Sequence, residues 1–157
     1  MGYIQELRRR VGNQPLIMVG AGVLIFNRQD EMLLLRRTDN GCWGIPGGAM
    51  EPGERIEETA RRETREETGL EVGELLLFNI FSGPDLYYRY PNGAEVFNVS
   101  VVYVTRDVRG KIAIDPEEHS EMGYFPLDEL PEDISPPVRP VLTSYRKSHN
   151  REGGNNR

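Results

Sequence analysis

The chain has 157 residues, which fits one domain of ordinary size and is long enough to bury a hydrophobic core without disulfides. It carries 19 basic and 25 acidic residues, a net charge of −6, so its field repels polyanions and disfavours a nucleic-acid polymer as partner. A single cysteine, Cys42, excludes an intrachain disulfide and favours a reducing, cytoplasmic setting. The first residues lack the apolar region of a signal peptide, and no apolar run approaches the roughly 20 residues of a membrane helix, so we expect no membrane association.

The N-terminal third predicts a helix, two strands and a loop. Apolar residues at helical spacing predict a short amphipathic helix over about residues 3–11. The apolar run 16–26 predicts a buried strand, and residues 31–36, after a polar turn, predict a second strand that pairs with the first as a hairpin. Clustered glycines then predict a loop over residues 40–48.

A charged helix is predicted over residues 55–68, because acidic residues in its early turns suit the helix dipole and Gly69 is placed to end it. Further strands are expected around a loop at 83–93, over residues 74–81, 95–105 and 111–114.

The C-terminal part predicts one helical turn at residues 127–130 and a last helix that ends near residue 148. The residues after it are polar, glycine-rich and charged, which predicts disorder. We therefore expect a single domain over residues 1–148 and a disordered tail over 149–157.

The charged helix places three carboxylates on one face. At about 100° per residue, Glu66 lies about 60° to one side of Glu63 and Glu67 about 40° to the other. Clustered hard oxygen ligands suit Mg²⁺ or Mn²⁺. Charge runs are nevertheless more often solvated surface, so this face alone does not establish a site.

The residue spacing before the helix favours a functional site over a solvated surface. Gly48 is followed after five residues by Glu54, and after seven more by the run Arg62–Leu70, which reads Arg-Glu-Thr-Arg-Glu-Glu-Thr-Gly-Leu. This pattern resembles the signature of the Nudix family, with eight of nine fixed positions met over 23 residues. The segment 43–48 also resembles the loop that opens this signature, and the strands around it resemble the family's layout.

Thr64 is the one departure, because the family usually has an aliphatic residue there. At four-residue intervals this position should face the core together with Ile56 and Ala60. We expect the threonine hydroxyl to bond a carbonyl one turn back, so that the change affects packing and not the metal chemistry.

The resemblance implies an α/β (α+β) fold, in which a mixed β-sheet is sandwiched between helices, and hydrolysis of a phosphoanhydride bond in a nucleoside diphosphate linked to another group. It implies Mg²⁺, with Mn²⁺ as the alternative, bound mainly by Glu66 and Glu67. By resemblance Glu63 completes the coordination or activates water, and the Gly48 carbonyl adds an oxygen. The resemblance also implies that Glu54 and Arg62 form a supporting pair, in which the arginine holds the glutamate.

A base outside the signature is common in the family, and the acidic segment 115–121 is the best candidate for it, with Glu118 favoured. A plain acidic surface loop is an equally good interpretation, and His119 within it is typical of a surface residue.

Nucleobase pockets need aromatic faces, and the candidates are Trp43, Phe78, Phe81, Tyr87, Tyr88 and Tyr90. Among them Trp43, Tyr87 and Tyr88 are favoured, although each is individually typical of packing. No proline lies sixteen residues past Leu70, where ADP-ribose hydrolases resemble one another in having one. Tyr87 and Tyr88 lie where dinucleoside polyphosphate hydrolases have a tyrosine, so the sequence leans towards those substrates, with ADP-ribose, sugar nucleotides and nucleoside triphosphates open.

Two other classes of function remain to be separated from the hydrolase. One is a catalytically silent module of the same fold that senses a nucleotide, against which the intact glutamates argue. The other is a structural or interaction protein, which requires the signature spacing to be coincidence. By resemblance a homodimer is open as an alternative to a monomer.

Overall fold

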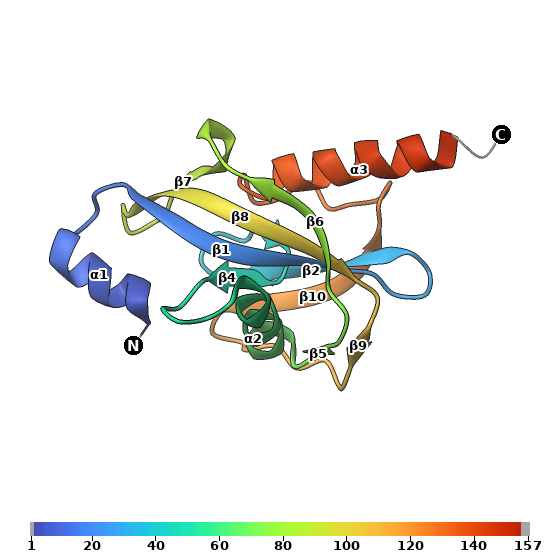
Figure 1. Cartoon of the computed structure of the whole chain (residues 1–157), viewed down its shortest axis with the longest axis horizontal. Helices are drawn as coiled ribbons and strands as arrows, with labels where there is room; N and C mark the ends of the chain where they lie inside the picture. The colour runs from blue at the N-terminus through green and yellow to red at the C-terminus, as the bar shows by residue number, and fades with distance from the viewer. Residues whose placement is uncertain (1, 155–157) are drawn as a thin grey trace.

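Strand β1 (Leu16–Ile25) lies inside a five-stranded mixed sheet in the computed structural model, which describes residues 2–154 (Figure 1). It pairs in parallel with β8 (Glu95–Thr105) and antiparallel with β4 (Gly47–Ala49). The opposite edge of β8 pairs antiparallel with β6 (Leu76–Phe81) and β7 (Tyr87–Arg89). The sheet is therefore mixed, as predicted.

A second, antiparallel sheet has the strand order β10-β2-β3. Its members are β2 (Glu31–Arg37), β3 (Trp43–Gly44) and β10 (His119–Pro126). The short strands β5 (Glu71–Val72) and β9 (Val108–Arg109) form a separate two-stranded ladder.

The predicted hairpin between residues 16–26 and 31–36 is wrong, because β1 and β2 belong to different sheets. Only an isolated bridge from Phe26 to Met32 joins the two segments. The backbone of β1 is instead satisfied by its pairing with β8 over its whole length and with β4 on its other edge. Long-range pairing thus outweighs the proximity that the turn provides.

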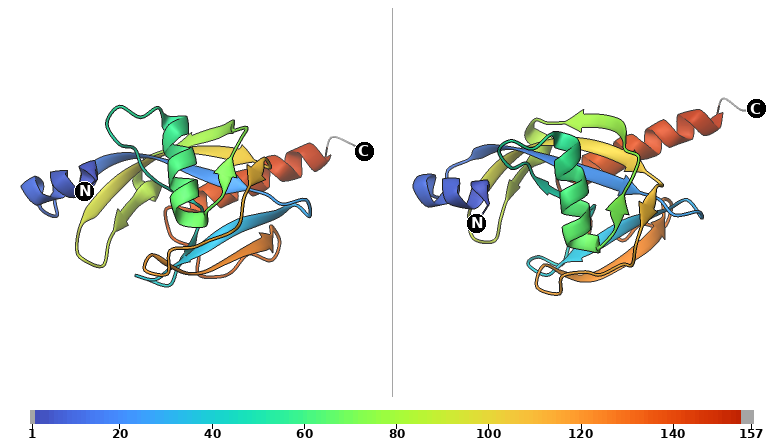
Figure 2. Two further views of the ribbon diagram at one scale, coloured as in Figure 1. Left: turned by 90° about the horizontal axis from the view of Figure 1, so that it is seen from below. Right: turned by 60° about the horizontal axis from the view of Figure 1, so that its bottom comes forward.

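Helices cover the five-stranded sheet on both faces. Alternate residues of β1 point to opposite sides, so that Val23 packs towards α2 (Ile56–Thr68) and Leu24 towards α3 (Arg139–Gly154). Figure 2 shows α2 across one face and α3 on the other side. This arrangement confirms the expected mixed sheet between helices.

The short helix α1 (Tyr3–Val11) has the predicted bounds and lies at one end of the molecule, away from both cores (Figure 1). Among the described residues, no helix is both long and apolar enough to span a membrane. A single 3₁₀ turn, η1 (Pro84–Leu86), precedes β7.

Several predicted elements need correction. Residues 111–114 form no strand, because β5 pairs instead with β9 just before them, and residues 127–130 form a turn without helix. Strand β10 was missed, because its sequence has few strongly strand-forming residues and its order comes from pairing with β2.

The last helix runs to Gly154, so the predicted end of the domain at residue 148 falls inside it. Local helical hydrogen bonds suffice to continue a helix through exposed polar residues, which composition alone does not reveal. The rest of the predicted tail, residues 155–157, lies outside the described residues.

Candidate active site

The segment from Gly47 to Thr68 folds as strand, loop and helix, and it places the acidic residues of α2 beside β4. Gly47 and Gly48 pair with Gly22 and Ala21 of β1. A Cβ atom on Gly48 would lie 2.4 Å from the Glu63 carboxyl carbon. A side chain at position 48 would therefore displace the Glu63 carboxylate from its place beside β4.

Arg62 organises the outer side of the helix. Its Nε and Nη2 donate to the two carboxylate oxygens of Glu54 at 2.7 and 2.9 Å, and Nη2 also donates to the Ala49 carbonyl at 3.0 Å. The same guanidinium donates to Glu63 at 2.8 Å and to Glu66 at 3.3 Å. Arg62 thus joins the loop, the helix and two of the clustered glutamates.

The carboxylates differ in pKa because their surroundings differ. Hydrogen bonds from Arg62 hold the pKa of Glu54 at about 2. Burial raises the pKa of Glu67 to about 8, although the Gly47 N–H donates to its Oε2 at 3.0 Å. Burial also raises the pKa of Glu63, opposed by Arg62. The two inner glutamates therefore lie in a setting that favours a nearby positive charge.

Glu63 and Glu67 line a cavity together with Glu117, Glu118 and His119, which approach from the start of β10. The Thr38 N–H and hydroxyl donate to the Glu118 and Glu117 carbonyls at 3.0 and 2.7 Å, which ties this loop to the end of β2. The acidic loop is thus brought opposite the helix. We call this the acidic cavity.

Glu66 lies differently from its neighbours. Its side chain is 56% exposed, it is held by Arg62, and it is absent from the lining of the acidic cavity. Within residues 2–154, no three acidic, histidine or cysteine side chains converge as a ready metal site. The glutamates instead take the nearest donors, Arg62 and the Gly47 N–H. As a donor set, clustered carboxylates beside a backbone carbonyl fit a hard divalent cation, once the side chains turn towards it.

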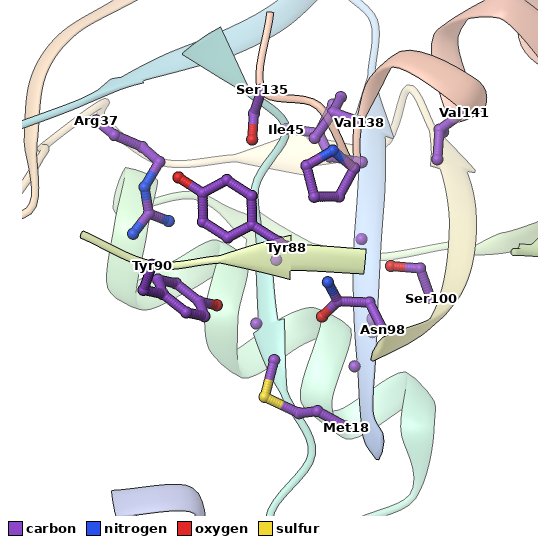
Figure 3. A pocket seen from close by; sticks show the side chains of 16 residues that line it. Met18, Arg37, Ile45, Tyr88, Tyr90, Asn98, Ser100, Ser135, Val138 and Val141 are labelled. Atoms are coloured by element: carbon purple, nitrogen blue, oxygen red, sulfur yellow. The ribbon is translucent and has the colours of Figure 1, made fainter. Parts of the chain in front are cut away.

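A second cavity, lined by tyrosines, adjoins the acidic one and shares part of its lining. Figure 3 shows the tyrosine-lined cavity. Tyr88 and Tyr90 extend into it from the segment around β7, and Asn98 and Ser100 reach it from β8. The Asn40 amide donates a hydrogen bond to the Tyr88 hydroxyl. The residues that line both cavities are Met18, Arg37, Gly47, Gly48 and Tyr90.

Four of the six aromatic candidates lie outside both cavities. Trp43 is 8% exposed and packs edge-on against Phe125 in the core, because β3 turns it inward. The Tyr87 hydroxyl donates to Glu95 and its ring lies against Phe97, outside the tyrosine-lined cavity. Alternation along β7 points Tyr88 into the cavity and Tyr87 away from it.

Phe78 and Phe81 also pack in the core instead of lining the tyrosine-lined cavity. They lie on β6, beneath α3, and the Phe78 ring contacts Tyr145 of that helix. Their role is to hold α3 on the sheet.

Sequence reasoning missed Arg37 and the polar residues of β8. Arg37 donates to both carboxylate oxygens of Asp39 at 2.9 and 2.7 Å, and this pairing raises the pKa of the guanidinium. Asn98 and Ser100 are polar residues at alternate positions in the mostly apolar middle of β8. That alternation was a usable signal, because it marks one face of a strand as open to a polar site.

Comparison with known proteins identifies the family. The sequence model of the NUDIX domain matches residues 16–145. The chain belongs to the Nudix hydrolase family. It is 34% identical over 110 residues to the ADP-ribose pyrophosphatase of Methanocaldococcus jannaschii, which covers 68% of this chain and 61% of that protein. It is 31% identical over 142 residues to the nucleoside triphosphatase NudI of Escherichia coli K12, which covers 87% and 96%.

A solved structure agrees with this assignment to the Nudix family. The MutT Nudix hydrolase from Burkholderia pseudomallei superimposes with a TM-score of 0.70 at 30% identity, over 82% of this chain and 97% of that one. The match spans 61%, 44% and 32% of the lengths of the first three curated relatives. Membership of the Nudix family is therefore shown, and the signature resemblance of residues 48–70 is explained by it.

Proposed function

We propose that the protein is a divalent-metal-dependent pyrophosphohydrolase that cleaves a phosphoanhydride bond in a nucleoside diphosphate linked to another group. The observation that carries this proposal is the continuity of the two cavities, one lined by Glu63, Glu67 and Glu118 and the other by Tyr88 and Tyr90. A nucleotide has two parts that match these cavities: a polyanionic phosphate chain, which metal-binding carboxylates can hold, and an aromatic base, which tyrosine rings can contact. The names of the pyrophosphatase and triphosphatase relatives support the same reaction class.

The tyrosine-lined cavity suits the nucleoside. Tyr88 and Tyr90 offer aromatic faces, while Asn98 supplies an amide and Ser100 and Ser135 supply hydroxyls that can bond the edge of a base or a sugar. Arg37 lies where the two cavities meet, so its guanidinium is placed for a phosphate of the bound diphosphate.

The acidic cavity needs positive charge before a diphosphate can enter. Glu67, Glu63 and Glu66, with the Gly48 carbonyl, would hold Mg²⁺, or Mn²⁺ in its place. A cation held there would neutralise charge on the diphosphate oxygens and would lower the pKa of the attacking water. Arg62 donates to both Glu63 and Glu66 and is not part of the lining of the acidic cavity, so it can hold the two carboxylates without occupying that space.

Glu63 and Glu118 are the two candidates for the general base. Both line the acidic cavity, and each raises the pKa of Glu67 by its charge. Glu118 comes from a loop opposite the helix, so it can take a proton from water on the side away from the metal ligands.

Hydrolysis of a substrate panel is the direct test. With Mg²⁺ present, ADP-ribose, dinucleoside polyphosphates, sugar nucleotides and nucleoside triphosphates are incubated separately, and the released phosphate species are identified. We expect turnover of at least one class. We test ADP-ribose and nucleoside triphosphates first, because the names of two relatives support them as candidates, and we keep dinucleoside polyphosphates on the panel because Tyr88 lines the cavity. Tight nucleotide binding without turnover of any class would instead support the sensing module.

Variants separate the proposed roles. Glu67→Gln should weaken Mg²⁺ binding and lower kcat at least about 100-fold, and Glu66→Gln should act in the same direction. Glu118→Gln should lower kcat about 100-fold while leaving Mg²⁺ affinity within about twofold, because a base contributes to proton transfer and not to coordination. Glu129→Gln, on an exposed turn, is the matched control. Near wild-type activity in Glu67→Gln would overturn the ligand assignment.

A further inference from the structure

Helix α1 forms part of the wall of the acidic cavity. Gly2, Ile4 and Gln5 line that cavity with Glu63 and Glu67, and none of the three lines the tyrosine-lined cavity. The match to the NUDIX domain begins only at residue 16. A segment outside the matched region therefore reaches the same space as the glutamates of the signature.

A short series of hydrogen bonds connects α1 to the signature helix. The Tyr3 N–H donates to Glu51 Oε2 at 3.0 Å, and the Glu51 N–H donates to Glu54 Oε1 at 2.8 Å. Glu54 is in turn held by Arg62. Glu51 occupies one of the variable positions between Gly48 and Glu54, so the signature loop itself carries the residue that fixes the start of α1.

The other end of α1 is held through Arg8. Its guanidinium donates to the Gln14 carbonyl at 2.5 Å and the Gly12 carbonyl at 3.1 Å, and it also donates to the Glu95 carbonyl at the start of β8. No residue of α1 is fully buried. Polar contacts at its two ends, and not core packing, therefore fix this wall.

The chemistry of the wall restricts what can lie against it. Ile4 offers an apolar surface and Gln5 an amide that both donates and accepts hydrogen bonds. The Glu51 carboxylate accepts from the Tyr3 N–H and places a negative charge beside the first turn of α1, which disfavours a phosphate there. Carboxylates outnumber the one arginine in the lining of the acidic cavity. An uncharged group that carries hydroxyls fits this wall better than a terminal phosphate does.

We propose that α1 is a specificity wall for the group linked to the nucleoside diphosphate, in which Gln5 hydrogen-bonds a hydroxyl-bearing group and Glu51 holds the helix in place. This inference rests on the proposed function, because it takes the nucleoside to lie in the tyrosine-lined cavity and the diphosphate beside Glu63 and Glu67. The linked group then extends towards α1.

Calorimetric titration with nucleotides that cannot be cleaved tests this proposal independently of turnover. The probes are α,β-methylene-ADP, which lacks a linked group, and α,β-methylene-ADP-ribose, which carries one, each titrated with Mg²⁺ present. Gln5→Ala should raise the Kd of the ribose-bearing probe at least threefold and leave that of α,β-methylene-ADP within twofold. Glu51→Ala should have the same selective effect, because it releases the start of α1. Arg9→Ala, on the exposed side of α1, is the matched control and should change neither Kd.

The outcomes of these titrations test the specificity wall separately from the proposed hydrolase function. If both probes bind the wild type and both variants change the two Kd values equally or not at all, the specificity wall is overturned and the proposed function stands. If neither probe binds the wild type, the specificity wall is overturned, and the proposed function is decided separately by turnover on the substrate panel. A parallel titration with α,β-methylene-ATP decides the chemistry of the linked group, because a Gln5 effect confined to this probe would overturn the hydroxyl-bearing assignment.

Discussion

Individual carboxylates in this protein take different roles because each has different neighbours. Glu54 is held by Arg62 and has a pKa of about 2, whereas Glu67 is buried and has a pKa of about 8. The side chain with the low pKa anchors the loop to the helix. The side chain with the raised pKa faces the acidic cavity, where a cation would relieve the cost of its charge.

Thr64 gives a prediction about stability. Its side chain is fully buried beside Ala60, as the helical spacing predicted, but its hydroxyl makes no hydrogen bond within the described residues, contrary to our expectation of a bond to the preceding turn. Thr64→Val removes a buried unsatisfied hydroxyl at nearly constant shape, so it should raise the free energy of unfolding by about 1 kcal/mol. Urea unfolding measures this change. Thr68→Val is the matched comparison and should destabilise, because the Thr68 hydroxyl donates to the Thr64 carbonyl at 2.6 Å.

The pair of Glu54 with Arg62 gives a pH prediction. Because folding lowers the Glu54 pKa from 4.5 to about 2, its contribution is complete above pH 4.5 and is lost as the pH falls towards 2. Glu54→Gln should therefore reduce the free energy of unfolding by about 1.5 kcal/mol at pH 7, and the difference from wild type should shrink below pH 4.5. Urea unfolding of the metal-free protein between pH 7 and about pH 3 checks this. A difference that stays constant with pH would show that the charge is not the cause.

At the scale of elements, α2 is positioned by the way it begins and ends. The Arg55 N–H donates to Glu58 at the start of the helix, and Gly69 ends it with a φ of 76°, in the left-handed region. After Gly69 the Ala113 N–H donates to the Thr68 carbonyl. The helix end is therefore packed against the segment before the acidic loop, which helps to set that loop opposite the helix.

Gly69→Ala tests this end. A Cβ atom there would lie 2.8 Å from the Lys111 carbonyl oxygen, in addition to the strain of a positive φ. Gly53→Ala is a matched control, since Gly53 also has a positive φ, of 86°, but open space around it. We expect Gly53→Ala to destabilise by about 1 kcal/mol and Gly69→Ala by at least about 1 kcal/mol more, measured by urea unfolding. If both substitutions lower the free energy of unfolding equally, the segment around Lys111 moves away from the new Cβ atom without a measurable energetic penalty.

At the scale of the whole molecule, the site lies where separate layers meet. The five-stranded sheet contributes Gly48 and Asn98, α2 contributes the glutamates, and the second sheet contributes Arg37 and the loop before β10. Unfolding separates these groups, so the bound cation and the fold should stabilise each other.

Metal addition measures this coupling. Because the proposed ligands converge only in the folded chain, Mg²⁺ at ten times its Kd should stabilise the protein by about 1.4 kcal/mol, seen as a rise in Tm. Glu67→Gln should reduce the rise, and Glu129→Gln should leave it unchanged. A rise of equal size in Glu67→Gln would place the stabilising cation elsewhere.

The sequence alone determined what depends on local geometry and fixed spacing. The bounds of α1 and α2, the stop at Gly69, the inward face of Thr64 and the spacing from Gly48 to Leu70 all follow from helical periodicity and from residue types suited to one backbone position. The spacing from Gly48 to Leu70 also identified the resemblance to the Nudix family, because that signature is defined by residue types at fixed intervals along the chain.

Only the tertiary structure decided what depends on pairing between distant segments. It separated β1 from β2, ordered β10, turned Trp43 into the core, directed Tyr88 into a cavity and brought α1 against the acidic residues. The physical reason is that strand pairing and cavity walls are set by competition among long-range contacts, which no local pattern encodes. The local sequence thus determined the acidic helix, and the tertiary fold determined which groups face it.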